Sequence, residues 1–288
     1  MTDTIVPSRV FPDARKAADV AAKHSIHTPQ TESPAYRLAF QDDEFLLRED
    51  LRPVRFQLEL LKPELLLDEA NIASMFVFYG SARIPEPSKA QALLDAATDP
   101  KAHAIAERLV AKSKYYEVAR DLARLASGFP RDMAGKRHFV VCSGGGPSIM
   151  EAANRGANDV GAETVGLNIV LPHEQAPNPY VTPALSFQFH YFALRKMHFL
   201  LRARAVAVFP GGFGTFDETF ELLTLIQTGK ISRIPILMFG RDFWERVVNF
   251  EALADEGVIN HRDLDLITWC ENAEEAWEMV THFWRDKE

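Results

Sequence analysis

The sequence predicts an α/β fold in which a parallel β-sheet lies between two layers of helices, with a helical extension before it. From about residue 73 onward, short apolar runs alternate with amphipathic stretches. This alternation is the pattern of strands joined by crossover helices. Two of the apolar runs, at residues 138–142 and 205–209, lead into glycine-rich turns that open a helix. Such crossovers are right-handed and cover both faces of a sheet.

The segment before this region has a different composition. Residues 1–35 are polar and contain several prolines, and one helical pattern spans residues 13–23. Residues 41–67 contain two expected helices, the second around residues 51–61 with Pro53 in its first turn. We therefore expect an N-terminal extension, residues 1–68, made of a mobile arm followed by helices. Residues 69–288 form the expected α/β domain.

The apolar runs of this domain differ in their pattern. Residues 185–189 alternate between apolar and polar, as a half-exposed strand does, whereas the run at 75–79 is continuously apolar, which is typical of a strand buried on both faces. Strands are expected at residues 75–79, 138–142, 164–170, 185–189, 205–209, 234–239 and 264–269. Helices are expected at residues 102–126, 148–158, 193–202, 215–228, 243–253 and 273–285. The order predicts a Rossmann-like three-layer domain.

Charge and cysteine content limit the partners and the compartment. The formal net charge of −8 disfavours a general affinity for nucleic acid or for an anionic membrane. Cys142 and Cys270 are too few for a disulfide framework and fit a reducing compartment. Residues 1–13 lack the apolar core of a signal peptide, and no apolar run reaches membrane-spanning length. We expect a cytoplasmic protein.

The turn at residues 209–218 is the first candidate site. Gly211, Gly212 and Gly214 allow positive φ and let a ligand approach the backbone, and the free N–H groups of the following helix favour a phosphate. Thr215 could cap the helix and still offer its hydroxyl, and Glu218 follows on the same helix. A tight turn and a Thr215–Glu218 capping box would also explain these residues. Three glycines within four residues favour the phosphate site.

A second glycine-rich turn, Gly144 to Gly146, follows the run at 138–142. Ligands bind at the carboxyl ends of parallel strands, so both turns are expected to face one crevice. Whether Gly144, Gly145 and Gly146 contact phosphate, ribose or base stays open. Ser148 and Glu151 also match a capping box.

No sequence motif points to a metal or a cofactor. The nine histidines form no HExxH or paired His/Cys spacing, and Gly229-Lys230 lacks the rest of a phosphate-binding P-loop. The GxGxxG fingerprint of NAD-binding domains is absent as well. We expect neither a metal nor a cofactor.

Three stretches resemble motifs of the "lonely guy" family of nucleoside 5′-monophosphate phosphoribohydrolases, long mislabelled lysine decarboxylases. They are GGGPSIMEAANRGA at residues 144–157, the Arg195-Lys196 pair, and PGGFGTFDE at residues 210–218. The resemblance covers roughly residues 71–288, so the first 66 or so residues mark a longer variant. Decarboxylation by pyridoxal phosphate would need a Schiff-base lysine, and nothing in the sequence locates one.

The resemblance implies hydrolysis of the N-glycosidic bond of a purine nucleoside 5′-monophosphate, giving free base and ribose 5-phosphate without a cofactor. Glu218 would hold the ribose hydroxyls or activate the attacking water, and Arg195 would stabilise the leaving base or the bound nucleotide. Lys196 and Thr224 match further substrate-binding positions. The choice between AMP and N6-prenylated AMP stays open, because it depends on the shape of the pocket.

Two alternatives use the same residues without turnover: a carrier of a phosphorylated pterin-like ligand, or a nucleotide sensor whose N-terminal arm contacts another protein. The Arg195–Glu218 pair favours the enzyme. The resemblance also implies a homodimer or a multiple of one.

Overall fold

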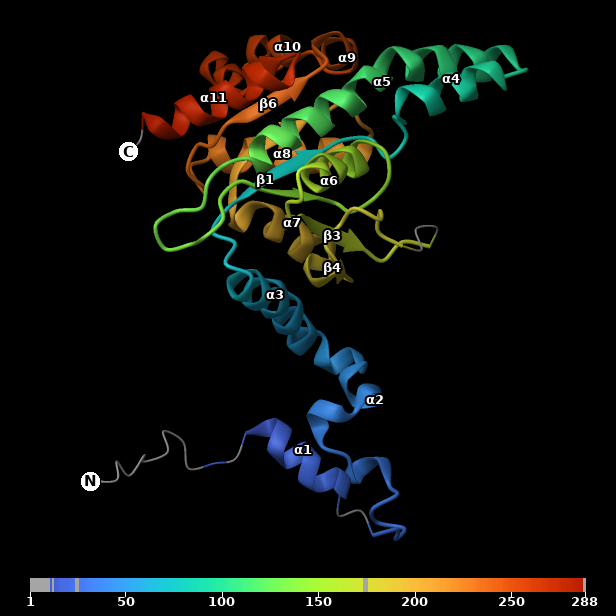
Figure 1. Cartoon of the computed structure of the whole chain (residues 1–288), viewed down its shortest axis with the longest axis vertical. Coiled ribbons are helices and arrows are strands. Elements are labelled where there is room, and N and C mark those ends of the chain that lie inside the picture. Colours follow the sequence, from blue (N-terminus) through green and yellow to red (C-terminus); the bar gives the residue numbers. More distant parts are fainter. Residues whose placement is uncertain (1–10, 12, 24–25, 173–175, 287–288) are drawn as a thin grey trace. The chain divides into compact units, whose positions relative to one another are not determined.

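The computed structural model describes residues 11, 13–23, 26–172 and 176–286 (Figure 1). The first residues of the expected mobile arm, 1–10 and 12, lie outside the described part. The chain divides into two compact units, Met1–Leu58 and Glu59–Glu288. The domain boundary that the sequence predicts between residues 68 and 69 stays a prediction.

The first unit consists of short helices. It contains α1 (Ala14–Lys23), α2 (Asp43–Leu46) and the beginning of α3 (Arg52–Glu69), with 3₁₀ turns at Pro34–Tyr36, Ala39–Gln41 and Glu49–Leu51. The Asp42 carboxylate accepts a hydrogen bond from the Phe45 amide at 3.2 Å and caps α2. Pro53 is the second residue of α3, as expected.

The second unit is built on one parallel sheet of seven strands in the order β4-β3-β2-β1-β5-β6-β7. The expectation of a parallel α/β sheet is confirmed. Every neighbouring pair is parallel. The strands are β1 (Met75–Tyr79), β2 (Val140–Ser143), β3 (Val165–Ile169), β4 (Ser186–Phe189), β5 (Ala203–Val208), β6 (Ile236–Phe239) and β7 (Thr268–Cys270).

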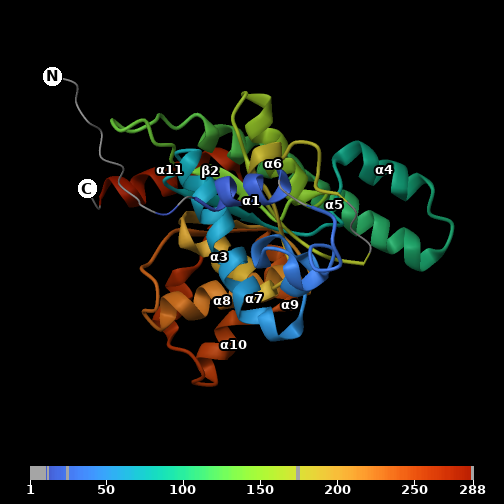
Figure 2. The same cartoon turned by 90° about the horizontal axis from the view of Figure 1, so that it is seen from below.

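Helices cover both faces of this sheet, which confirms the three layers (Figures 1 and 2). On one face, Phe76 and Phe78 of β1 join a core formed with α5, α6 and α11. On the other face, the Tyr79 ring meets Phe199 of α7 edge-on, with ring centres 5.2 Å apart. Since all five residues of β1 are buried, its continuous apolar run is explained. The helices of this unit are α4 (Pro87–Asp95), α5 (Pro100–Ser127), α6 (Ile149–Asp159), α7 (Phe192–Leu201), α8 (Phe213–Gln227), α9 (Arg241–Val247), α10 (Phe250–Asp255) and α11 (Ala273–Arg285).

Three local expectations were wrong or incomplete. The single helix expected at residues 243–253 is two helices, α9 and α10, because Val248 is extended and the Asn249 side chain caps the second by accepting from the Ala252 amide at 3.0 Å. The strand expected at 264–269 is a 3₁₀ helix, His261–Leu266, followed by β7. Helix α4, which begins with Pro87 and forms a hairpin with α5, was not expected from the sequence (Figure 1).

The two expected capping boxes do not form. Helix α8 begins at Phe213, with Gly212 as N-cap, so Thr215 lies inside the first turn and Glu218 in the second. Ser148 is the N-cap of α6, but its φ is +63° and its side chain makes no capping hydrogen bond. Glu151 instead accepts a hydrogen bond from the Tyr116 hydroxyl at 2.9 Å. Glu218 is therefore not occupied with capping its own helix.

Candidate active site

A cavity of about 610 Å³ opens at the carboxyl ends of the central strands. Strands β1 and β5 are neighbours, and the chain runs outward from them in opposite directions across the sheet. Ligands of open α/β sheets bind at such a switch point. The cavity is lined by Gly80, Ser81, Ala82, Arg83, Met150, Arg195, Gly212, Phe213, Gly214, Thr215, Phe216 and Glu218.

The turn between β5 and α8 forms one wall of this cavity. A Cβ atom on Gly211 would lie 2.1 Å from the Thr215 hydroxyl, so only glycine fits there, whereas Gly212 and Gly214 have open space where a Cβ would stand. None of the three glycines has a positive φ. Glycine is therefore present here because neighbouring atoms or a ligand come close to the backbone, and not because the backbone is left-handed. Within the described residues, no group accepts a hydrogen bond from the amides of Phe213, Gly214 or Thr215. Free amides at a helix N-terminus suit an anion.

Arg195 reaches the opposite wall from α7 and is held rigidly. Its Nε donates to the Leu167 carbonyl at the end of β3 at 2.6 Å, and its Nη1 lies 3.3 Å from Glu218 Oε1. The guanidinium also lies over the Phe199 ring, 5.0 Å from its centre. Only 11% of the Arg195 side chain is exposed. A fixed planar donor group therefore faces the cavity.

Glu218 is the acid of the site. Its side chain is 13% exposed. Burial raises the pKa of Glu218 from 4.5 to about 7; the Arg195 charge opposes this shift, and Asp217 adds to it. A carboxyl group whose pKa lies near neutral pH can take or give a proton under ordinary conditions. The pair thus combines a fixed cation with a proton-transfer group.

The turn of Gly144 to Gly146 lies behind this pair and does not line the cavity. A Cβ atom on Gly144 would lie 2.5 Å from Arg195 Nη2, so this glycine leaves room for the guanidinium. Gly145 has a φ of +71° and lies against Asn168. Asn178 holds the turn, because its amide donates to the Gly145 carbonyl at 2.8 Å and its side chain to the Gly146 carbonyl at 3.0 Å. Direct substrate contact by these glycines stays a prediction.

Two other expected residues lie outside the cavity. The Lys196 ammonium lies 3.1 Å from Asp217 and 3.1 Å from Glu221, which ties α7 to α8. Thr224 lines a separate hollow of about 90 Å³, and its hydroxyl donates to the Phe220 carbonyl at 2.7 Å. Their contact with substrate stays a prediction.

The loop after β1 also contributes to the cavity, which was not expected from the sequence. Ser81 and Arg83 line the cavity, and the Ser81 hydroxyl accepts a hydrogen bond from the Arg83 amide at 3.0 Å. The Arg83 side chain is exposed, and no carboxylate among the described residues pairs with it. The signal was present in Gly80-Ser81, which follows a buried strand at the same edge of the sheet as both glycine turns.

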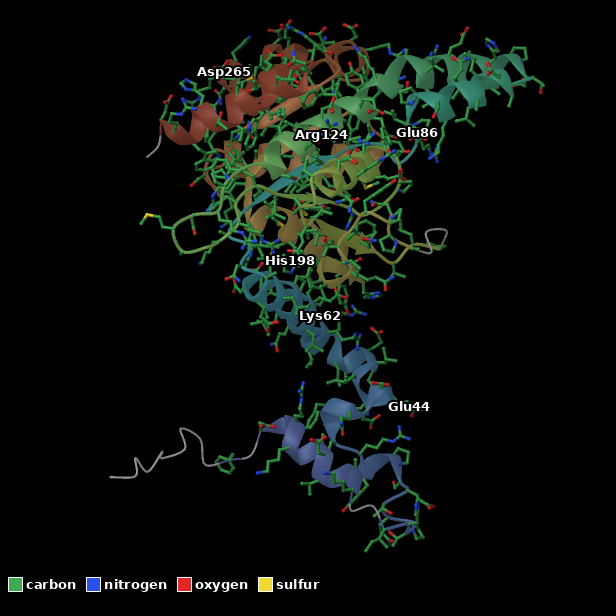
Figure 3. The ribbon with its side chains drawn as sticks, in the orientation of Figure 1. Glu44, Lys62, Glu86, Arg124, His198 and Asp265 are labelled. Atoms are coloured by element: carbon green, nitrogen blue, oxygen red, sulfur yellow. The ribbon has the colours of Figure 1, made fainter. Side chains whose placement is uncertain are left out.

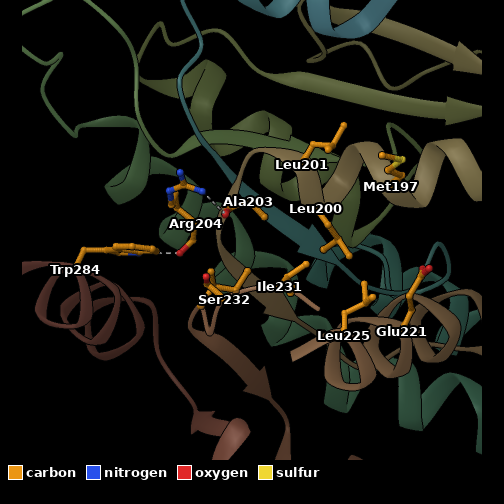
Figure 4. A pocket seen from close by; sticks show the side chains of 11 residues that line it. Met197, Leu200, Leu201, Ala203, Arg204, Glu221, Leu225, Ile231, Ser232 and Trp284 are labelled. Carbon is orange, nitrogen blue, oxygen red and sulfur yellow. Dashed lines mark hydrogen bonds between the residues drawn. The ribbon is translucent and has the colours of Figure 1, made fainter. Parts of the chain in front are cut away.

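A larger cavity of about 890 Å³ lies away from this chemistry, between α7, α8 and Trp284 (Figure 4). Its walls are mainly aliphatic, and the Trp284 indole donates to the Arg204 carbonyl at 2.8 Å. It contains neither glycine turn. Glu221 is its one acidic lining residue.

The described residues contain no group of three or more His, Cys, Asp or Glu side chains that could hold a metal ion. They also contain no helix that is long and apolar enough to cross a membrane.

The fold and the site together define an α/β protein with a buried arginine–acid pair in one cavity with the start of a helix that has no side-chain cap. A model of the family described as "Possible lysine decarboxylase" matches residues 150–280. Cytokinin riboside 5′-monophosphate phosphoribohydrolase LOG2 of Arabidopsis thaliana is 23% identical over 176 residues, which cover 60% of this chain and 78% of the relative. The LOG7 protein of the same plant is 25% identical over 176 residues, covering 60% and 76%. These matches support the resemblance to the lonely guy family that the sequence motifs indicated.

Solved structures resemble the chain more loosely. The Moco carrier protein from Chlamydomonas reinhardtii superposes with a TM-score of 0.42 at 14% identity, covering 74% of this chain and 98% of that one. The molybdenum cofactor binding protein from Rippkaea orientalis gives a TM-score of 0.41 at 19% identity, covering 59% and 87%. Superpositions this loose carry no argument about function.

Proposed function

We propose that the protein hydrolyses the N-glycosidic bond of purine nucleoside 5′-monophosphates, AMP or N6-modified AMP of the cytokinin type. The observation that carries this proposal is the buried Arg195–Glu218 pair in one cavity with the free amides at the start of α8. A 5′-phosphate fits the amides, and the sugar then lies beside the carboxyl group. The curated relatives, which are cytokinin riboside 5′-monophosphate phosphoribohydrolases, support the same reaction.

In the proposed reaction, the bond between C1′ and the base nitrogen breaks through an oxocarbenium-like ribose, and water adds to C1′. Glu218 in its ionised form takes the proton that the water loses, and its charge favours the cationic transition state. The base leaves with the electron pair of the broken bond and takes up one proton from solvent, and Glu218 gives its proton back to solvent, so the products are free base and ribose 5-phosphate. Arg195 would hold the leaving base or the nucleotide through its planar donor group. The reaction needs no cofactor.

The phosphate site has a mechanistic purpose. Contacts to the 5′-phosphate are remote from C1′, and such contacts can position the sugar for reaction. Gly212, Gly214 and Thr215 line the cavity at the helix start and are the residues we assign to this contact. The cytoplasmic location and the homo-oligomeric state expected from the sequence stay predictions.

The test is chromatographic detection of free base after incubation with AMP, N6-prenylated AMP and adenosine. We expect release from the monophosphates and at least about 100-fold less from adenosine, since a nucleoside cannot use the anion site. Glu218→Ala should abolish release. Equal rates on AMP and adenosine would show that the cavity does not bind the phosphate. Tight AMP binding without release would instead favour a carrier or a sensor.

A further inference from the structure

Helix α7, which carries Arg195, does not cap its own N-terminus. Its N-cap residue, Tyr191, makes no side-chain capping hydrogen bond. Glu59 of α3 instead binds the chain just before the first turn: its carboxylate accepts a hydrogen bond from the His190 amide at 2.8 Å and from the amide of the N-cap residue Tyr191 at 3.2 Å. A carboxylate at a helix N-terminus satisfies free amides and interacts favourably with the helix dipole.

The same stretch of α3 holds α7 at two further points. The His198 side chain is 1% exposed, and its Nε2 lies 3.1 Å from the Glu59 carbonyl. Because a carbonyl can only accept, Nε2 carries the proton of this bond. Burial lowers the pKa of His198. Figure 3 labels His198 on α7 and Lys62 on α3.

The third point lies just beyond the end of α7. The Arg202 guanidinium donates to the two Glu64 carboxylate oxygens at 3.1 and 2.9 Å, and to Asp68 at 2.8 Å. Its Nη1 also donates to the Ile72 carbonyl at 2.5 Å. Helix α3 therefore holds α7 at its start, at its last turn and at its C-cap residue. These contacts all lie within the second unit, residues 59–288.

A short series of hydrogen bonds connects this support to the site. Glu59 fixes the Tyr191 peptide, and the Tyr191 carbonyl accepts a hydrogen bond from the Arg195 amide at 3.1 Å. The Arg195 side chain then spans from the Leu167 carbonyl to Glu218. A shift or rotation of α7 would change the distance between the guanidinium and the carboxyl group on α8.

We infer that Glu59 is a positioning residue for the reaction: through the N-terminus of α7 it sets the place of Arg195 relative to Glu218. This inference rests on the proposed function. Glu59 does not line the cavity, so it acts on the reaction through Arg195 and not on the substrate. It also gives α3, most of which lies in the N-terminal extension expected from the sequence, a role in positioning the active site.

The experiment compares Glu59→Gln and Glu59→Ala with the wild-type chain. Glutamine keeps one acceptor oxygen and alanine keeps none, so kcat should fall in that order, by roughly ten- to hundredfold for alanine. The KM for AMP should stay within about twofold, because an interaction lost only in the transition state lowers kcat alone. Glu69→Gln is the matched control. It lies on the same helix, and its side chain makes no hydrogen bond or ion pair with the described residues.

A structural readout separates misplacement from unfolding. Hydrogen exchange of the amides at residues 190–195 should be faster in both Glu59 variants and unchanged in Glu69→Gln, at temperatures where circular dichroism shows all chains folded. Base release by the wild-type chain with unchanged kcat in both Glu59 variants would overturn the inference alone. No base release by the wild-type chain would overturn the proposed function, and this positioning role with it.

Discussion

The surroundings of Glu218 set its chemistry. A glutamate exposed on a helix stays ionised at neutral pH and exchanges no protons there. In this chain, burial raises the pKa of Glu218 to about 7, and the Arg195 charge keeps the shift from being larger. The ionised carboxylate therefore exists at neutral pH at some cost in folding free energy, as in many sites where a carboxyl group transfers protons.

This cost can be measured without any substrate. Between its ordinary pKa of 4.5 and its folded pKa of about 7, the folded chain binds more protons at Glu218 than the unfolded chain does. Stability is therefore lost as the pH rises through this range. Glu218→Gln removes the loss. We expect it to unfold with a higher free energy than the wild-type chain at pH 8, by up to about 3 kcal/mol, and with a similar one at pH 4.

Urea denaturation of both chains at the two pH values provides the measurement. The difference between the chains is what matters, because other titrating groups act on both alike. If the free energies of unfolding of Glu218→Gln and the wild-type chain differ by the same amount at pH 4 and pH 8, the pKa of Glu218 is not raised.

The shape of Arg195 should matter as much as its charge. Its guanidinium donates to the Leu167 carbonyl and faces Glu218 at the same time. A lysine ammonium is a point charge and cannot reproduce both contacts. We expect Arg195→Lys to lower kcat by roughly 10- to 100-fold, the loss typical of one charge-assisted hydrogen bond. Steady-state kinetics measure this, with Arg204→Lys, outside the site, as control; a near-normal kcat for Arg195→Lys would remove Arg195 from the mechanism.

For single residues, the resemblance to known motifs predicted the pair of Arg195 and Glu218, whereas the spacing of residues in the sequence did not. Spacing could equally have assigned Glu218 to a capping box, and only the start of α8 at Phe213 shows that no such box forms. Ser81 and Arg83 escaped prediction because their place in the site depends on the order of strands in the sheet. Strand order follows from long-range packing, which a local pattern does not contain.

At the scale of elements, the two glycine turns serve different purposes. The turn before α8 leaves amides open to the cavity, whereas the turn before α6 packs tightly against Arg195 and Asn168. The two turns have the same pattern in the sequence: an apolar run, three glycines and a helical pattern. Their difference arises because Asn178, more than thirty residues further on, holds the second turn to the protein.

Gly144 provides a test of this packing. A Cβ atom there would lie 2.5 Å from Arg195 Nη2 and 2.9 Å from the Met150 sulfur, so side chains and not backbone would have to move. We expect Gly144→Ala to fold but to lower kcat about tenfold or more, because the guanidinium is displaced. Gly128→Ala, at the end of α5, is the control with unchanged kcat. Equal kinetics for the two variants would mean that Arg195 tolerates displacement.

Boundaries were predicted less well than the elements themselves. Helix α11 and strand β1 match their expected ranges, because each is a strongly patterned segment with a clear start. The expected helix at 243–253 missed the break at Val248, since apolar spacing continues across it. The capping side chain of Asn249 decides the break, and it competes with helix propensity locally.

At the scale of the whole molecule, sheet order explains where the site lies. Strands β1 and β5 are adjacent although four helices, α4 to α7, and three strands separate them in sequence. The loops after both strands therefore meet, and the cavity forms between them. Any chain with this order would have a crevice there; Arg195 and Glu218 give this crevice its chemistry.

The last prediction concerns assembly. Leu58, Leu61 and Leu65 on α3 are 52%, 52% and 57% exposed, and their spacing of three and four residues forms one apolar stripe along the helix. Apolar stripes of this kind usually contact another chain. We expect light scattering to give a mass of at least twice the 32.4 kDa of one chain.

The contribution of α3 is tested by two changes of this stripe. The variant with both Leu61→Glu and Leu65→Glu should lower the measured mass, because burying two carboxylates against an apolar surface is unfavourable. Lys101→Glu, at an exposed position on α5 and away from the stripe, is the control and should leave the mass unchanged. A monomeric wild-type chain would contradict the assembly itself. An oligomer that survives the double change would place the contact elsewhere, for example at the exposed Met197 and Leu201 beside the larger cavity.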